Sequence, residues 1–204
     1  NGPKVLLPLL SVIICMLIGC TIHAVCVYSA MTTVAAHMSP VTFFRGMSEA
    51  MAIAFTTCSS AGTLPVNMKN VQEKLGVHRD IASFVLPLGA TLNMAGTALY
   101  MGVCSIFTAN VFGVPPAFGQ MMMIVLTGTL ASIGSAGVPG AGLIMLAMVL
   151  QSVGLPLEGL ALVAGIDRVL DMFRTCLNIT GDAAVAVVVN ASEQEVPSDI
   201  QITE

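Results

Sequence analysis

Long apolar segments alternate with short polar or glycine-rich interruptions along this chain of 204 residues. No Asp, Glu, Lys or Arg occurs between Lys4 and Arg45, or again between Asp80 and Glu158. A helix that crosses a bilayer needs about 20 predominantly apolar residues, so both stretches are long enough to hold membrane segments. The pattern predicts an all-α integral membrane protein. Its predicted spanning helices occupy residues 5–36, 78–112 and 158–190.

Two further apolar segments, residues 41–75 and 118–153, are broken near their centres. The first contains SSAGTLP from Ser59 to Pro65, and the second contains SIGSAGVPGAG from Ser132 to Gly142. Proline removes a helix hydrogen bond and glycine favours a break, so neither segment is predicted to be one straight helix. A broken backbone is tolerated inside a membrane only where protein, water, substrate or ions satisfy its polar groups. A pair of such segments indicates the binding site of a secondary transporter.

The composition is also typical of an integral membrane protein. Hydrophobic residues make up 56% of the chain and charged residues 9%, whereas a soluble domain carries about 25% charged residues. The net charge of -4 and the lack of Trp and of a Lys/Arg stripe give no support for nucleic-acid binding. Six cysteines lie in or beside apolar segments without metal-binding spacing, which predicts buried thiols. No arrangement typical of an enzyme is visible, so catalysis is not predicted.

The last span carries a line of polar residues on one face. At positions i, i+4, i+7, i+11 and i+15 stand Asp167, Asp171, Arg174, Asn178 and Asp182. At about 100° per residue they fall within an arc of about 80° on an otherwise apolar helix. An ionisable group costs about 2.5 to 3.5 kcal/mol at the centre of a membrane. This face is therefore predicted to point into the protein or into a wet cavity.

The chemistry of these side chains indicates what the face could bind. The planar fork of Arg174 suits a carboxylate, and Asp171 can accept hydrogen bonds from a substrate ammonium. Asn178 offers both donors and acceptors, and Asp182 supplies the hard oxygen ligand that a small hard cation prefers. A structural ladder of ion pairs, such as Asp171 with Arg174, is the alternative interpretation. Such a ladder would not require two broken segments beside it.

Four motifs resemble the glutamate transporter family, which comprises the excitatory amino acid transporters, their neutral amino acid relatives and prokaryotic sodium–aspartate symporters. They are SSAGTLP from Ser59, LPLGATLNMAGTALY from Leu86, ASIGSAGVPGAG from Ala131 and DRVLDMFRTCLNITGD from Asp167. The matching stretches cover most of residues 50–185, and the last two are long and specific.

The resemblance implies the architecture of a parent protein. In this family each protomer of a homotrimer has a scaffold domain and a transport domain that moves like an elevator. Residues 1–190 would form the core of the transport domain, with re-entrant hairpins at 41–75 and 118–153, the second of which is the extracellular gate. Residues 191–204 would form an acidic cytoplasmic tail. Because it begins at Asn1 without Met, the chain is interpreted as a piece of a longer protein.

The resemblance also implies which residues bind substrate. Arg174 would bind the side-chain carboxylate, Asp171 the amino group and Asn178 the main-chain carboxylate. The full set implied by position is Ser59, Ser60, Thr97, Val138, Gly142, Asp171, Arg174, Thr175 and Asn178. Neutral amino acid relatives lack this arginine, so Arg174 favours aspartate or glutamate as the substrate. The sequence does not choose between these two.

Sodium ions are the coupled cations that the resemblance implies. One ion would be bound by the Asp182 carboxylate with carbonyls of Gly89, Asn93 and Asn178. A second would be bound by carbonyls of Thr91, Ser132, Ile133 and Ser135. The family usually reads Asn-Met-Asp-Gly where this chain reads Asn-Met-Ala-Gly at 93–96. The missing Asp is a ligand of a third sodium ion, so Ala95 predicts fewer coupled cations. Members also often carry a further Arg at the position of Cys58 or of Met172, and neither is Arg here.

The positive charges predict how the chain lies in a plasma membrane that it crosses several times. Lys4 would be outside and Arg45, Lys69, Lys74 and Arg79 inside, in line with the positive-inside tendency. The leading prediction is a sodium-coupled symporter of acidic amino acids. Symporters of dicarboxylates, or of neutral amino acids such as serine or threonine, are the alternatives on specificity. An uncoupled, channel-like protein and an inactive truncated module are alternatives of another class.

Overall fold

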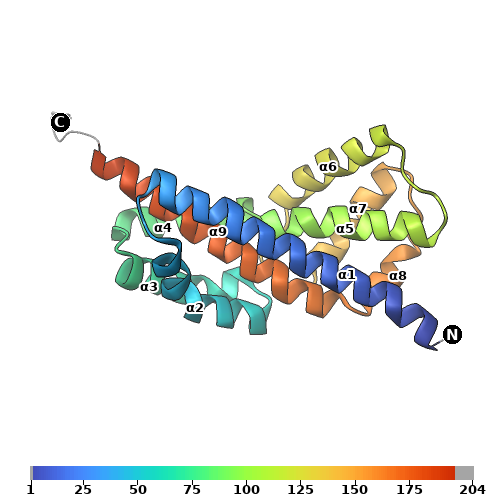
Figure 1. The fold of residues 1–204 in the computed structure, drawn as a ribbon, viewed down its shortest axis with the longest axis horizontal. Coiled ribbons are helices and arrows are strands. Elements are labelled where there is room, and N and C mark those ends of the chain that lie inside the picture. The colour runs from blue at the N-terminus through green and yellow to red at the C-terminus, as the bar shows by residue number, and fades with distance from the viewer. Residues whose placement is uncertain (1, 196–204) are drawn as a thin grey trace.

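The computed structural model describes residues 2–195, which form helices with no strand among them (Figure 1). Two elements, η1 and η2, are π-helical turns that continue the first helix. In chain order the elements are α1 (Gly2–Ile22), η1 (His23–Tyr28), η2 (Met31–Ala35), α2 (Pro40–Thr57), α3 (Ser60–Leu75), α4 (Arg79–Leu92), α5 (Ala95–Val111), α6 (Phe118–Ile133), α7 (Ala141–Ser152), α8 (Gly159–Ala164) and α9 (Asp167–Glu195).

Three stretches of the described chain are long and apolar enough to cross a membrane: Leu7–Ala35, Arg79–Val111 and Asp167–Glu193. The prediction of a helical chain is therefore confirmed for these residues, and three of its helical stretches have the length and apolar composition that a span requires. Of an apolar run of 18 residues in each stretch, 17% is buried in the first stretch and 67% in the last. Figure 1 accordingly shows α9 running through the middle of the molecule, where it packs against α2, α3, α4 and α5. The first stretch instead presents apolar side chains outward, as a lipid-facing helix does.

The last predicted span differs from the sequence expectation at both ends. The single helix predicted over 158–190 is divided into α8 and α9 at Gly165 and Ile166. A tight turn, in which the Ile166 amide donates to the Val163 carbonyl at 3.0 Å, ends α8 at a residue that favours helix breaks. Helix α9 then continues to Glu195. Residues 196–204, which include most of the predicted acidic tail, lie outside the described residues, as does residue 1.

Helices α2 and α3 form a pair joined by a turn of two residues. Cys58 adopts a left-handed conformation with φ 55°, and its amide donates to the Ala54 carbonyl at 2.9 Å, which closes α2. Ser59 is extended and its Oγ accepts a hydrogen bond from the Gly62 amide at 3.0 Å. A serine in this position satisfies one of the free amides at the start of a helix. The turn at Cys58 and Ser59 is called the first tip below.

Helices α6 and α7 form the second pair, and residues 134–140 connect them. Gly140 has a φ of 79°, which glycine adopts without steric cost. This connection is called the second tip. The two tips touch, because the Gly137 carbonyl accepts hydrogen bonds from Ser59 Oγ at 3.0 Å and from the Ala61 amide at 3.2 Å. Glycine favours this close approach, since a β-carbon at Gly137 would lie only 3.0 Å from the Ala90 carbonyl oxygen.

The break predicted near Asn93 separates α4 from α5. The Gly96 amide does not continue the helix but donates to Oδ1 of Asn178 on α9 at 2.7 Å. A β-carbon at Gly96 would lie 2.5 Å from the Arg174 carbonyl oxygen, so this glycine lets the start of α5 press against α9. The break thus sits beside the polar face of α9.

Candidate functional site

One pocket lies where α5 and α9 meet the two tips. The residues predicted from sequence that line it are Ser60, Thr97, Ser135, Val138, Gly142, Asp171, Arg174, Thr175 and Asn178. Of the residues expected to bind substrate, only Ser59 is absent from the lining, and it instead joins the two tips. The free volume is about 10 Å³, which is room for about one water molecule. In this conformation the pocket is therefore too small for a larger molecule.

Arg174 lies at the centre of this pocket and is 3% exposed. Its Nε is 2.9 Å from Oδ1 of Asp171, and its Nη1 is 3.5 Å from Oδ1 of Asp167. Its guanidinium also lies over the ring of Tyr100, 4.5 Å from the centroid. The ladder of ion pairs considered from sequence thus exists, but it is part of the pocket wall. These contacts use Nε and Nη1, and within residues 2–195 no hydrogen bond or ion pair reaches Nη2, which remains for a carboxylate.

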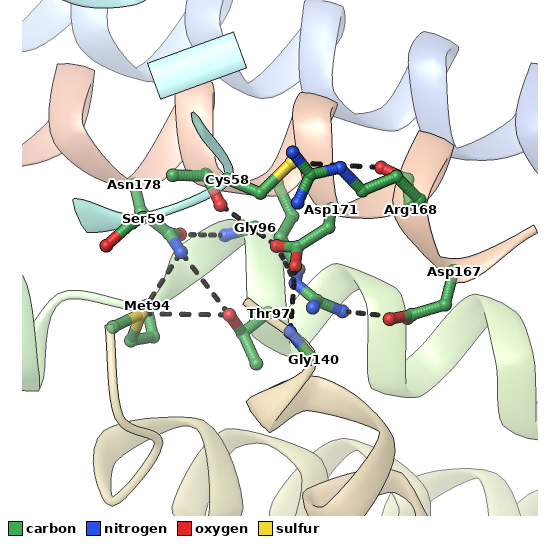
Figure 2. A network of polar contacts seen from close by, with 12 residues as sticks. Cys58, Ser59, Met94, Gly96, Thr97, Gly140, Asp167, Arg168, Asp171 and Asn178 are labelled. Atoms are coloured by element: carbon green, nitrogen blue, oxygen red, sulfur yellow. Dashed lines mark hydrogen bonds and ion pairs between the residues drawn. The ribbon is translucent and has the colours of Figure 1, made fainter. Parts of the chain in front are cut away.

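Asp171 connects α9 to the second tip, as Figure 2 shows. Its Oδ2 accepts a hydrogen bond from the Gly140 amide at 3.1 Å, and its Oδ1 accepts one from Thr175 Oγ1 at 3.0 Å. The carboxylate is therefore fixed by neighbours on two elements and is 3% exposed. A displacement of the Gly140 amide away from α9 would free this acceptor, which belongs to the pocket lining.

Asn178 occupies the opposite side of the pocket (Figure 2). Its Oδ1 is held by the Gly96 amide, so its Nδ2 is the group that remains for a ligand. Nδ2 lies 3.3 Å from Thr97 Oγ1 and 3.1 Å from the sulfur of Met94. A thioether is a weak acceptor, so a carboxylate oxygen would replace this contact at a gain.

The residues predicted for the first cation lie deeper along α9. Asp182 is 1% exposed, and its Oδ1 accepts a hydrogen bond from Asn93 Nδ2 at 3.0 Å. A β-carbon at Gly89 would lie 2.6 Å from that same oxygen, so α4 touches the carboxylate here. Within residues 2–195, no Lys, Arg or His lies within 4.0 Å of it. A buried carboxylate without a cationic partner is costly, so this donor set fits a small hard cation such as sodium.

The residues predicted for the second cation are less closely grouped. Ser132 and Ile133 end α6, and Thr91 is near the end of α4, where carbonyls lack partners within their own helix. The Ser132 carbonyl accepts a hydrogen bond from the Ser135 amide at 3.1 Å, and Ser135 itself lines the pocket between the two tips. Thr91 is exposed, and its Oγ1 donates to the Leu88 carbonyl at 2.9 Å. Helix C-termini favour cations, which supports the predicted ligand type.

Several residues of the site were not assigned a role from sequence. Asp167 belongs to the predicted stripe, and its spacing of seven residues from Arg174 was the available signal. Tyr100 and Met94 gave no such signal, because their partners lie far away in the chain. Arg168 was also not assigned a role from sequence. Its Nη2 donates to the Thr56 carbonyl at 2.9 Å, beside the first tip. Neither Cys58 nor Met172 supplies an arginine here, whereas Arg168 reaches the same tip from the first turn of α9.

The chain is similar to excitatory amino acid transporters over most of its length. It is 44% identical over 174 residues to one from Caenorhabditis elegans, an alignment covering 85% of this chain and 35% of the relative. It is 41% identical over 181 residues to excitatory amino acid transporter 2 of Homo sapiens, covering 88% and 32%. It is 44% identical over 168 residues to excitatory amino acid transporter 5 of Mus musculus, covering 82% and 30%. The chain thus spans about a third of the length of these relatives.

A model of the sodium:dicarboxylate symporter family matches residues 1–192. This range contains both tips, the break at Asn93 and the polar face of α9. The relatives are named as transporters and not as enzymes, and the name of the family implies sodium coupling. Together with the three apolar spans, the match identifies a membrane protein. The chain therefore belongs to the sodium:dicarboxylate symporter family.

Proposed function

We propose that this chain is the substrate- and sodium-binding core of a symporter that carries aspartate or glutamate with sodium ions. The observation that supports this most directly is the convergence of Arg174, Asp171 and Asn178 on one pocket that both tips close. A guanidinium, a carboxylate and an amide donor are the three partners that an acidic amino acid requires. The names of the relatives, excitatory amino acid transporters, point to the same substrate class.

Each group of the substrate has a matching partner in this proposal. The side-chain carboxylate pairs with the Arg174 guanidinium through its remaining donors, and the ammonium pairs with Asp171. The main-chain carboxylate accepts from Asn178 Nδ2 in place of the Met94 sulfur. A plain dicarboxylate would leave the buried carboxylate of Asp171 without its partner, which costs free energy. A neutral amino acid would leave the Arg174 fork unpaired for the same reason.

The charges of α9 supply a physical reason for cation coupling. Its buried charged residues are three carboxylates, Asp167, Asp171 and Asp182, and one guanidinium, Arg174. An acidic amino acid adds further negative charge to a site that is already negative. Sodium ions bound at Asp182, and at the carbonyls that end α4 and α6, would neutralise this charge inside the membrane. The substrate would then bind well only when the cations bind too.

The helix pairs fit the role of re-entrant hairpins in an elevator-type transporter. Each is too short to cross a bilayer twice, and the tips meet at the pocket. We propose that the α6–α7 pair opens first, because its second tip covers Asp171 and Gly142. The parent would be a multi-pass protein of the plasma membrane and a homotrimer. Its remaining segments would supply the scaffold.

Transport by the full-length parent in proteoliposomes tests the proposal. Labelled aspartate uptake is measured under an inward sodium gradient and under an equimolar choline gradient. Competition by unlabelled glutamate, serine and succinate is measured in the same preparation. We expect uptake only with sodium, with strong competition by glutamate and weak competition by serine and succinate.

Two results would contradict this function. Equal uptake in sodium and choline would remove the coupling and favour a channel-like protein. Competition by succinate or serine as strong as that by glutamate would remove the assigned roles of Asp171 or Arg174, and would favour the dicarboxylate or neutral amino acid alternative.

A further inference from the structure

We propose that Arg168 is a positioning residue that clamps the first tip onto the first turn of α9 and so holds one wall of the substrate pocket. The inference rests on the proposed function, because the ligand of that pocket is taken to be an acidic amino acid. Arg168 is the second residue of α9 and lies beside Cys58 of the first tip (Figure 2). It does not line the pocket, and its side chain reaches Thr56 on α2.

The side-chain contact is made to a helix end that needs it. Arg168 Nη2 donates to the Thr56 carbonyl at 2.9 Å, across 112 positions of sequence. Thr56 is the penultimate residue of α2, and the last four carbonyls of a helix have no amide partner within that helix. Cations stabilise this negative end, but α2 carries no basic residue in its own last turn. Arg168 therefore supplies the missing cation from another helix.

Arg168 contacts the same tip through its main chain. Its carbonyl oxygen lies 3.9 Å from the Cys58 sulfur, and Cys58 is the left-handed residue at which the chain turns. One turn earlier, the ring of Phe55 packs edge-on against that of Phe173, with centroids 5.5 Å apart. These contacts line up along one seam between α2 and α9. The guanidinium lies on the exposed side of this seam.

The first tip, which this seam holds against α9, also forms part of the pocket wall. Cys58 and Ser60 line the pocket together with Asp171 and Arg174. Cys58 is 1% exposed although it belongs to a turn, since the tip lies flat on α9. Loosening the tip would move Cys58 and Ser60 away from the ligand. An exposed ionic hydrogen bond is weak enough to break during each cycle, which suits a clamp on a moving tip.

The clamp predicts a specific change in transport by the full-length parent. In Arg168→Gln the shortened side chain cannot reach Thr56, so the pocket wall is less ordered before substrate binds. We expect KM for aspartate to rise about fivefold while kcat is kept or rises, because one exposed charge-assisted bond is lost and opening becomes easier. Arg168→Lys retains the charge and one donor, and should recover most of the wild-type KM. A variant that was merely misfolded would lower kcat instead.

Cys58 provides an independent readout of tip position. All other cysteines of the parent are replaced, including Cys15, Cys20, Cys26, Cys104 and Cys176 of this chain, and alkylation of Cys58 by a maleimide is timed. We expect Arg168→Gln to speed alkylation about fivefold, and Arg168→Lys to have a small effect. Arg79→Gln, which makes the same change at an exposed arginine at the start of α4, is the matched control and should change neither readout.

Unchanged alkylation and unchanged KM in Arg168→Gln would overturn the clamp. Faster alkylation with a normal KM would overturn its role in positioning the pocket wall. Failure of the proposed function is distinguishable, because a parent that does not transport aspartate still gives an alkylation rate for Cys58. In that case faster alkylation in Arg168→Gln alone would support the clamp.

Discussion

A β-carbon at Gly142 would overlap the Nη1 atom of Arg174. Gly142, the second residue of α7, is therefore the surface against which the guanidinium lies. Aspartate uptake by Gly142→Ala should fall at least about tenfold, because the methyl group must displace either the guanidinium or α7 in a close-packed site. Uptake kinetics of the full-length parent measure this. Gly119→Ala on α6 is the control, since a β-carbon there meets open space. Equal activity of both variants would contradict the assigned contact.

Replacement of the guanidinium should change which substrates bind. In Arg174→Gln we expect the KM for labelled aspartate to rise about 10- to 100-fold, because the charged partner of the side-chain carboxylate is lost. Serine, which has no side-chain carboxylate, should compete better relative to glutamate than it does in the wild type. Arg174→Lys keeps the charge without the fork, and should be intermediate. If Arg174→Gln bound glutamate normally, the substrate carboxylate would have to be bound elsewhere.

Removal of the charge on Asp182 should weaken the response to sodium. Asp182→Asn keeps the shape and an oxygen acceptor for Asn93 but removes the anionic ligand. We expect the sodium concentration for half-maximal uptake to rise about tenfold or more, while the aspartate KM at saturating sodium changes less. Asp80→Asn, at an exposed position on α4, is the control. A normal sodium dependence in Asp182→Asn would argue against the first cation site.

Ala95 is the position at which the chain departs from the family motif. The substitution Ala95→Asp adds a carboxylate to the first residue of α5, where the positive end of the helix favours it. We expect the Hill coefficient for sodium and the charge moved per aspartate both to rise. Ala95→Asn, of the same size without the charge, should leave them unchanged. An unaltered coefficient in Ala95→Asp would show that residue 95 does not limit the number of coupled cations.

The sequence by itself determined the membrane segments and the inward face of α9. Apolar runs of sufficient length and breaks rich in glycine and proline are local properties, so the three spans and the interruption at Asn93 could be predicted. The polar stripe was equally local, because 3.6 residues per turn fix which side chains share a face. The division at Gly165 was missed, since an isolated glycine in an apolar run permits either outcome.

Only the tertiary structure decided which distant groups meet at the pocket. Contacts between Asn178 and Met94, Arg174 and Tyr100, and Arg168 and Thr56 join residues 74 to 112 positions apart, and no periodicity encodes them. They depend on how α2 and α5 lie against α9, and Gly96 permits the close approach of α5. The charged groups could therefore be identified from the sequence, whereas the packing of the helices determined their partners. The physical reason is that a side chain's type is local, whereas its neighbours are set by the helices around it.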